Sequence, residues 1–244
     1  MNDTNPLSLV TPGTLTLGAS DFDARPMTYV EGDQRLGYEP DVARALCAYL
    51  GLTPVWINLP MAKFYSALHD RRCDGVWFNQ AVTPARCAHS QFTQPYGLFD
   101  EAVIVRADSS IQTAEDLAGL KLGGLADSTN LELGRAFEGA ELVPFPGSDQ
   151  VLPEMLAALR AGEIDALVDD ELVLITAAEA DPSLRLAFTV ETRHPFAIAL
   201  HPDSNALLMA LNQGLDALVA DGTLESLWQQ WIPWRPFPLT PAAL

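Results

Sequence analysis

The sequence predicts an α/β fold for this chain of 244 residues. Short apolar runs bounded by turn residues alternate with stretches whose apolar residues recur at helical spacing, a pattern typical of strands and helices that follow one another. Hydrophobic residues make up 48% of the chain and charged residues 19%. This composition excludes a disordered chain, and no apolar run reaches the roughly 18 residues that a membrane-spanning helix needs. We therefore expect a soluble globular protein with one large domain or two smaller ones.

The first part of the chain predicts strands and helices in turn. A helix opens at Pro40 with apolar residues at a period of 3.6 and ends at Gly51. A further helix is expected over residues 64–68. Strands are expected at residues 15–17, 55–57 and 75–78.

The second part continues this alternation. Thr113 with Asp116, and Thr129 with Glu132, have the spacing of capping boxes, so they predict helices that end at Gly119 and Gly139. Later helices are expected over residues 151–160, after a cap at Ser204, and over 223–231, while strands are expected at 120–125, 164–168 and 196–200.

Acidic residues dominate the charge. Against 14 Lys and Arg stand 32 Asp and Glu, which gives a net charge of -18 and a pI near 4.3. Such a surface repels phosphate backbones and anionic lipid, so neither a nucleic acid nor a membrane surface is expected as a partner. A solvated surface explains the acidity, and we infer no cationic ligand from it.

The cysteines and the first residues leave the compartment open. Cys47, Cys73 and Cys87 contain no CxxC pair and allow at most one internal disulfide. Residues 1–14 lack a basic segment followed by an apolar one, so the chain as given shows no secretory signal, and it is either cytoplasmic or already trimmed.

Catalytic and metal motifs are weak. The histidines form no HExxH or zinc-finger spacing, and no Gly-x-Ser-x-Gly motif accompanies them. His69, Cys73, Cys87 and His89 could be drawn as a metal set, but their irregular spacing is better explained by chance. We expect no metal and no cofactor, because Gly123 and Gly124 also lack the remainder of a phosphate-binding loop.

Several motifs in order resemble one known family, the bacterial type 3 extracellular solute-binding proteins that serve polar amino acid ABC importers. They are GTL at residues 13–15, GYEPDVA at 37–43, TPAR at 83–86 after Asp74, GEIDA at 162–166 before Asp170, and DGTL at 221–224 before Trp231. The resemblance covers nearly the whole chain.

This resemblance implies a two-lobed clamshell in which each lobe is a mixed sheet flanked by helices. The chain would cross between lobes near residues 100–104 and 190–196, which gives one lobe of residues 1–102 plus 193–244 and a second of 103–192. It also implies a monomeric periplasmic or extracytoplasmic protein that binds a small zwitterion or carboxylate, most naturally an amino acid, and delivers it to a membrane permease.

The family resemblance marks Arg86 and Asp170 as ligand-binding residues, and the predicted helix start at Thr129 adds a third. Arg86 stands where the family binds the ligand carboxylate, and a guanidinium fork suits that task; the alternative is an ion pair with a surface carboxylate. Thr129 would offer a helix N-terminus to the same carboxylate, or act only as a cap. Asp170 would accept the α-ammonium, although Asp169 beside it leaves the register open and a solvated acidic turn is the alternative.

Other pocket positions depart from the family. Ala24 and Met61 replace a pair of aromatic residues that often stack on the ligand. Phe78 takes the place of a small or hydroxyl residue and is expected either in the core or in the pocket wall, whereas Trp77 is expected in the core. Asn79 is expected to adopt a positive φ where glycine would otherwise stand.

Ala81, which follows these residues in the sequence, is also predicted to line the ligand pocket. The loop after the first strand carries Asp21, Asp23 and Arg25, which the resemblance assigns to the end of the pocket that holds the ligand side chain; Asp23 is included in the predicted site.

Two other functions stay open at this point. Cyclohexadienyl dehydratases, which act on prephenate or arogenate, resemble the same fold and retain the arginine, but dehydration needs a general acid that we do not identify in the sequence. A sensory or accessory clamshell that docks a partner protein is supported only by the missing aromatic pair.

Overall fold

The computed structural model describes residues 6–239, in which strands and helices alternate as the sequence predicts. Residues 1–5, part of the segment tested for a leader, lie outside this range. The strands are β1 (Thr14–Ala19), β2 (Tyr29–Glu31), β3 (Gln34–Leu36), β4 (Thr53–Asn58), β5 (Gly75–Val76), β6 (Gln91–Phe92), β7 (Gly97–Arg106), β8 (Lys121–Leu125), β9 (Glu141–Phe145), β10 (Ala166–Asp170), β11 (Leu184–Phe196) and β12 (Ala199–Leu200).

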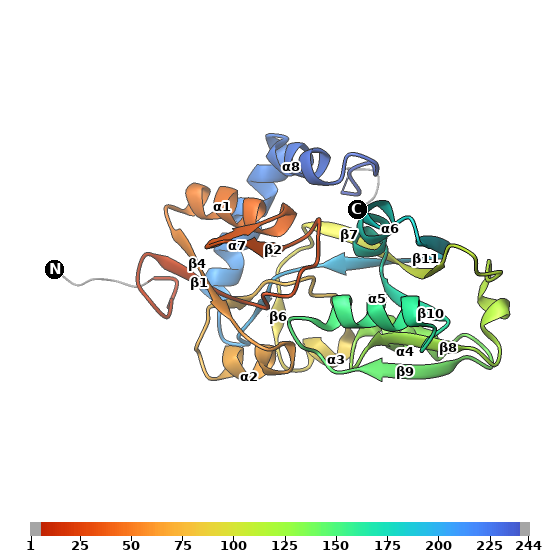
Figure 1. Ribbon diagram of the computed structural model, residues 1–244. Coiled ribbons are helices and arrows are strands. Elements are labelled where there is room, and N and C mark those ends of the chain that lie inside the picture. The colour runs from red at the N-terminus through yellow and green to blue at the C-terminus, as the bar shows by residue number, and fades with distance from the viewer. Residues whose placement is uncertain (1–5, 240–244) are drawn as a thin grey trace. The chain divides into compact units, whose positions relative to one another are not determined.

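Helices follow most of these strands (Figure 1). The α-helices are α1 (Tyr38–Leu50), α2 (Phe64–His69), α3 (Pro84–Cys87), α4 (Thr129–Gly134), α5 (Val151–Ala161), α6 (Glu171–Ala180), α7 (Asn205–Ala220) and α8 (Thr223–Trp231), and the 3-10 helices are η1 (Met61–Lys63) and η2 (Ala114–Leu117). The predicted α/β fold is confirmed. Within residues 6–239, no helix combines the length and the hydropathy needed to cross a membrane.

The chain divides into two compact units. Unit 1 consists of residues 1–21, 27–98 and 194–244, and unit 2 of residues 22–26 and 99–193.

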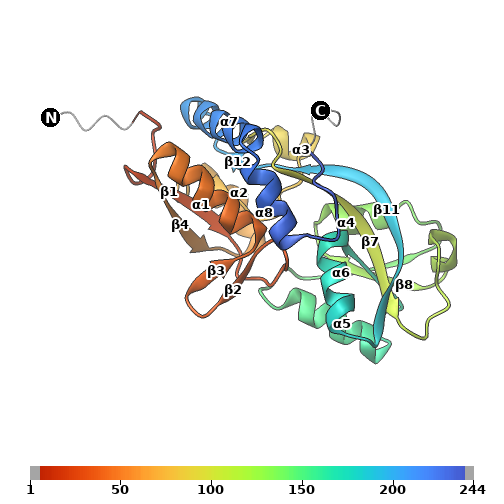
Figure 2. The same cartoon turned by 90° about the horizontal axis from the view of Figure 1, so that it is seen from above.

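Unit 1 is built on a mixed sheet in the order β4-β1-β5-β12-β6. β1 runs parallel to β4 and β5, and β12 runs antiparallel to β5 and β6. Helices α1, α7 and α8 pack on one another, as Figure 2 shows. The Tyr38 and Trp228 rings meet edge to face at a centroid distance of 5.3 Å and are fully buried, so they join α1 to α8 in the core.

Unit 2 is built on a second sheet in the order β11-β7-β10-β8-β9. β10 is antiparallel to β7 and parallel to β8, so the carboxyl ends of β8 and β10 lie at the same edge of the sheet. The buried core on this sheet includes Val103, Val105, Leu122, Ala166 and Val168. Thr129, which follows β8, and Asp170, the last residue of β10, are therefore brought to one edge.

Most predicted elements are confirmed, with shifted ends. The helix predicted from Pro40 begins at Tyr38 and ends at Gly51, which adopts a φ of 67°. The helix predicted over 151–160 is α5, and the helix predicted over 223–231 is α8. Ser204 stands at the N-cap position of α7, but its side chain makes no capping hydrogen bond.

Two predicted strands have different bounds. The strand expected over 75–78 ends at Val76, because the chain turns at Asn79, whose φ is 45°. The strand expected over 164–168 is β10, whose antiparallel ladder with β7 continues until Asp170 lies opposite Glu101. This register extends the strand to the predicted site residue itself.

Two helix predictions are corrected. The capping box of Thr113 and Asp116 is present, but it opens the 3-10 helix η2 and no α-helix. Thr129 is not a cap: the Ser128 Oγ accepts the hydrogen bond from the Leu131 backbone N–H at 3.1 Å, and α4 ends at Gly134, before the predicted end at Gly139. Ser128 can cap α4 in place of Thr129 because serine is at least as good an N-cap as threonine.

Candidate ligand-binding site

The predicted residues of unit 1 gather on the segment that joins β5 to α3. Thr83 caps α3, and its Oγ1 accepts the Arg86 backbone N–H at 3.3 Å. The Arg86 Nη1 donates to the Ala81 carbonyl oxygen at 2.9 Å, and its guanidinium carbon lies 5.9 Å from the centroid of the Tyr65 ring. Arg86 is half-buried and forms no ion pair with any carboxylate among residues 6–239. We call Tyr65, Gln80, Ala81 and Arg86 the arginine cluster.

Phe78 and Asn79 lie near the start of this segment. Phe78 is 4% exposed and meets Phe64 edge to face at a centroid distance of 5.8 Å, which favours the core alternative for its side chain. Asn79 has the predicted positive φ, and its backbone N–H donates to the Glu39 Oε1 at 2.8 Å. Trp77 is fully buried, as predicted. The polar support of this turn therefore comes from Glu39, which the sequence analysis missed.

Glu39 is a fully buried carboxyl group in α1. Besides the Asn79 N–H, its Oε1 accepts a short hydrogen bond from the Tyr96 hydroxyl, while its Oε2 is buried with no hydrogen-bond partner among the described residues. Burial raises the pKa of Glu39 to about 7, although both hydrogen bonds and the charge of Arg35 act in the opposite direction. Near neutral pH this group therefore changes its charge beneath the Asn79 turn.

The predicted residues of unit 2 form a second group. The Thr129 Oγ1 donates to the Asn130 Oδ1 at 3.1 Å. The buried Asn130 amide donates in turn to the Oδ1 atoms of Asp169 and Asp170, each at 2.9 Å. We call Thr129, Asn130, Asp169 and Asp170 the aspartate cluster. Asn130 connects the two predicted residues Thr129 and Asp170 and had no signal in the sequence that could have identified it.

The two carboxylates differ in exposure. Asp170 is 7% exposed, whereas Asp169 is half-buried. The pKa of Asp169 is raised, first by burial and further by the charge of Glu101, although hydrogen bonds from the Asp170 N–H and Asn130 oppose the rise. The cluster can accept a cation at two neighbouring carboxyl groups.

The remaining predicted residues join neither cluster through a polar contact. Asp23 pairs with Arg25, with 3.4 Å between the Oδ1 and the Nε. Asp21 is paired with the buried Arg35. Met61 is half-buried at the start of η1, and Ala24 is buried. The carboxylates of the loop after β1 are therefore engaged locally.

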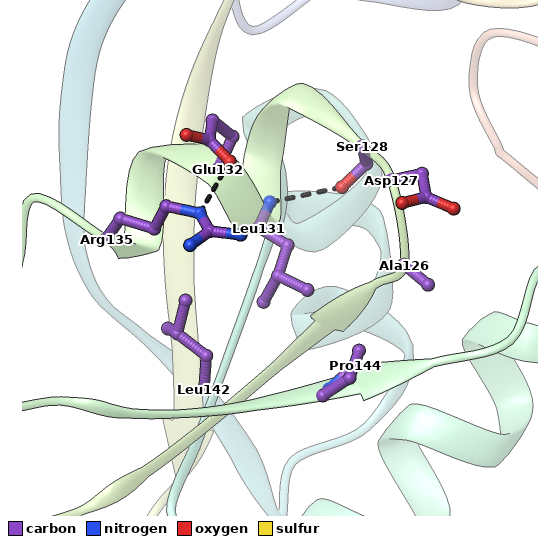
Figure 3. Close-up of a pocket in the computed structure, with 8 residues that line it drawn as sticks. All are labelled: Ala126, Asp127, Ser128, Leu131, Glu132, Arg135, Leu142 and Pro144. Carbon is purple, nitrogen blue, oxygen red and sulfur yellow. Dashed lines mark hydrogen bonds and ion pairs between the residues drawn. The ribbon is translucent and has the colours of Figure 1, made fainter.

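A cavity of about 390 Å³ lies in unit 2 beside α4, but it does not coincide with the aspartate cluster (Figure 3). Leu131, Leu142 and Pro144 line it together with the ion pair of Glu132 and Arg135, whose Oε2 and Nε are 2.6 Å apart. Glu132 and Arg135 therefore balance each other, and Asp127 adds a further carboxylate to the wall. Thr129, Asn130 and Asp170 are not among its lining residues.

The cysteines and histidines offer no metal centre in the described part of the chain. Cys47 and Cys73 are buried free thiols, and Cys87 is an exposed one. Among residues 6–239, no group of three or more His, Cys, Asp or Glu side chains is arranged to hold a metal ion.

Solved structures share this fold. An ancestral arginine-binding protein bound to arginine matches with a TM-score of 0.82 at 24% identity, covering 90% of this chain and 98% of that one. A mutant of ArgBP from T. maritima matches with a TM-score of 0.82 at 23% identity over 91% and 96% of the two chains. AncCDT-1, an ancestral amino acid-binding protein described as a precursor of cyclohexadienyl dehydratase, matches with a TM-score of 0.80 at 25% identity over 90% and 95%. These likenesses define the fold class of the chain, an α/β fold that it shares with these proteins.

Curated relatives agree with this class. The "Probable amino-acid ABC transporter-binding protein" of Haemophilus influenzae is 28% identical over 222 residues, which cover 89% of this chain and 84% of the relative. ABC transporter arginine-binding protein 1 of Escherichia coli is 27% identical over 204 residues, covering 81% and 82%. The model of the bacterial extracellular solute-binding proteins, family 3, matches residues 16–233. The chain belongs to this family.

Proposed function

We propose that this protein binds a free α-amino acid and delivers it to the permease of an ABC importer. The observation that carries this proposal is the Arg86 side chain, a half-buried guanidinium with one carbonyl contact and no carboxylate partner among residues 6–239. A fixed arginine fork of this kind is suited to a ligand carboxylate. The proposed role also entails an extracytoplasmic location, which the family membership supports, and a monomer is proposed as its oligomeric state.

The aspartate cluster provides the complementary charge. Asp170 would accept the α-ammonium, and Thr129 would bind the ligand carboxylate together with Arg86. Arginine, histidine and cystine are named as ligands of relatives in this family, and all three are α-amino acids. Asn79, Ala81, Met61 and Asp23 are proposed as parts of the surrounding wall, and Phe78, whose side chain is buried against Phe64, would support that wall from the core.

A thermal-shift screen of the L-amino acids, with cystine and simple carboxylates included, tests the proposal. A ligand that binds only the folded state stabilises it by about 2.7 kcal/mol at a hundredfold excess over Kd, which corresponds to a rise in Tm of about 5 to 10 °C for a chain of this size. We expect at least one α-amino acid to give such a rise. An unchanged Tm across the whole panel would contradict the proposal.

Substitution of Asp170 by Asn is expected to weaken amino acid binding by about tenfold or more, because a charge-assisted hydrogen bond to the ligand ammonium becomes a neutral one. Asp169→Asn is the matched control from the same cluster, and we expect a smaller loss because the ammonium is assigned to Asp170. Isothermal titration calorimetry of both variants measures the difference. A larger loss in the Asp169 variant would move the proposed ammonium site by one residue.

Dehydration of prephenate or arogenate is the second candidate function, and the likeness to AncCDT-1 favours it. Such a reaction needs a general acid, and the raised pKa of Asp169 makes this carboxyl a candidate proton donor. We expect no phenylpyruvate from prephenate and no phenylalanine from arogenate. Turnover that disappears in the Asp169→Asn variant would instead establish an enzyme.

A further inference from the structure

Arg86 reaches its position through a side-chain network that none of the predicted ligand contacts includes. Its Nη1 is held by the Ala81 carbonyl oxygen, and one face of the guanidinium lies over the Tyr65 ring. The Nε and Nη2 atoms donate to no residue in the described part of the chain. The ring and the carbonyl therefore fix the plane of the guanidinium while one edge stays open to an incoming carboxylate.

Tyr65 is itself fixed by a second residue. Its hydroxyl donates to the Gln80 Oε1 at 2.7 Å, and the Gln80 Nε2 donates to the Phe78 carbonyl oxygen at 2.6 Å. Gln80 is 6% exposed, so this buried amide connects Tyr65 to the backbone of the segment that carries Arg86. Burial raises the pKa of Tyr65 to about 12, which keeps its hydroxyl protonated as the donor that Gln80 requires.

We propose that Tyr65 and Gln80 are positioning residues that hold the Arg86 guanidinium in place for the ligand carboxylate without contacting the ligand. This inference rests on the proposed function, because it assumes that Arg86 binds that carboxylate. An arginine fork gains its advantage over a lysine only when its plane is fixed, and preorganisation reduces the ordering that binding would otherwise require.

The first experiment examines the unliganded protein and needs no ligand. The Arg86 Nε–Hε resonance, assigned with Arg86→Lys, is compared between the wild type and Tyr65→Leu by ¹H–¹⁵N NMR. Loss of the ring is expected to move this resonance toward the shift of an exposed arginine. Tyr49→Leu, which removes a tyrosine that is 56% exposed on α1, is the matched control and is expected to leave it unchanged. An unmoved resonance in Tyr65→Leu would overturn the proposal.

The second experiment is a double-mutant cycle in Kd. L-Arginine and its α-carboxamide, L-argininamide, are the first probes, replaced by the corresponding pair for whichever amino acid binds most tightly in the screen. Tyr65→Leu is expected to weaken binding of the amino acid roughly three- to tenfold and to leave the weaker binding of the carboxamide unchanged. In the Arg86→Ala background, the same substitution is expected to have no further effect.

The outcomes separate this inference from the proposed function. If no amino acid binds the wild type, the proposed function fails. If an amino acid binds but Arg86→Ala leaves Kd unchanged, the proposed function stands, whereas the assignment of the carboxylate to Arg86 and the positioning role both fail. If Arg86→Ala weakens binding but the Tyr65→Leu effect persists in that background, the proposed function stands and the positioning role fails. Should Tyr65→Leu be unstable, Tyr65→Phe and Gln80→Leu provide the same test. Both retain the aromatic ring and remove the hydrogen bond between the Tyr65 hydroxyl and Gln80. Both are expected to weaken binding by less than Tyr65→Leu. Unchanged Kd values in all three variants would refute the positioning role.

Discussion

Substitution of Arg86 by Ala is expected to weaken amino acid binding by about 10 to 150-fold. A hydrogen bond to a charged group contributes about 1.5 to 3 kcal/mol, and this range converts to that change in Kd. The substitution also removes the hydrogen bond to the Ala81 carbonyl oxygen and the contact with Tyr65, which belong to the unliganded protein. Calorimetric titration of the variant with the amino acids identified by the thermal-shift screen measures the change.

Two further variants test whether the weaker binding arises from the guanidinium group of Arg86. Arg86→Lys keeps the charge but lacks the fork, so we expect an intermediate Kd. Arg160→Ala removes an arginine that is engaged in an ion pair with Asp181, with 2.7 Å between the Nε and the Oδ2, and it is expected to leave Kd unchanged. Equal binding by Arg86→Ala and the wild type would refute the assignment of the carboxylate to this side chain.

The buried Glu39 is expected to make the free energy of unfolding depend on pH between about 4.5 and 7. Its pKa is higher in the folded than in the unfolded protein, so the folded state binds this proton more tightly. The associated stability is complete below the unfolded pKa and is lost as the pH rises through about 7. The loss amounts to about 3 kcal/mol, because each unit of difference in pKa corresponds to about 1.4 kcal/mol.

Glu39→Gln isolates this contribution. The amide oxygen of the substituted side chain can still accept from the Asn79 N–H and the Tyr96 hydroxyl, but the amide does not ionise. Two other carboxyl groups with raised pKa values, Asp74 and Asp169, remain in both proteins. Chemical denaturation at pH 5 and pH 8 should therefore show a larger decrease for the wild type than for the variant. Parallel pH profiles for the two proteins would show that Glu39 stays in one protonation state.

The predictable part of the fold follows from local signals. The helix from Pro40 to Gly51 and the helix of residues 151–160 were predictable because apolar periodicity and a terminal glycine agree. The helix α6 was missed because its apolar residues surround the helix, which removes the periodicity. The strand β11 alternates apolar and polar residues along much of its length, so a signal for it was present in the sequence.

Some residues of the candidate site could likewise be predicted from local signals, and others could not. Arg86, Asp170 and Thr129 could be proposed because motifs mark them, and the positive φ of Asn79 could be expected from its residue type. Glu39, Tyr65, Gln80 and Asn130 could not, because they act through contacts between segments distant in sequence, such as the 40 residues that separate Asn79 from Glu39. Thr129 was assigned the cap because it precedes Glu132 at the right spacing, whereas Ser128, one residue earlier, makes the bond.

The division of the chain into its two units constrains the order in which they can fold during synthesis. Residues 99–193 form an almost complete unit, whereas unit 1 also needs residues that follow them. The β12 strand, which pairs with β5 and β6 in the middle of the unit 1 sheet, leaves the ribosome only after all of β7 to β11. While more than a hundred residues between β5 and β12 are synthesised, the sheet of β1, β4 and β5 therefore has an unpaired edge at β5. The nascent chain is consequently most exposed to aggregation during that interval.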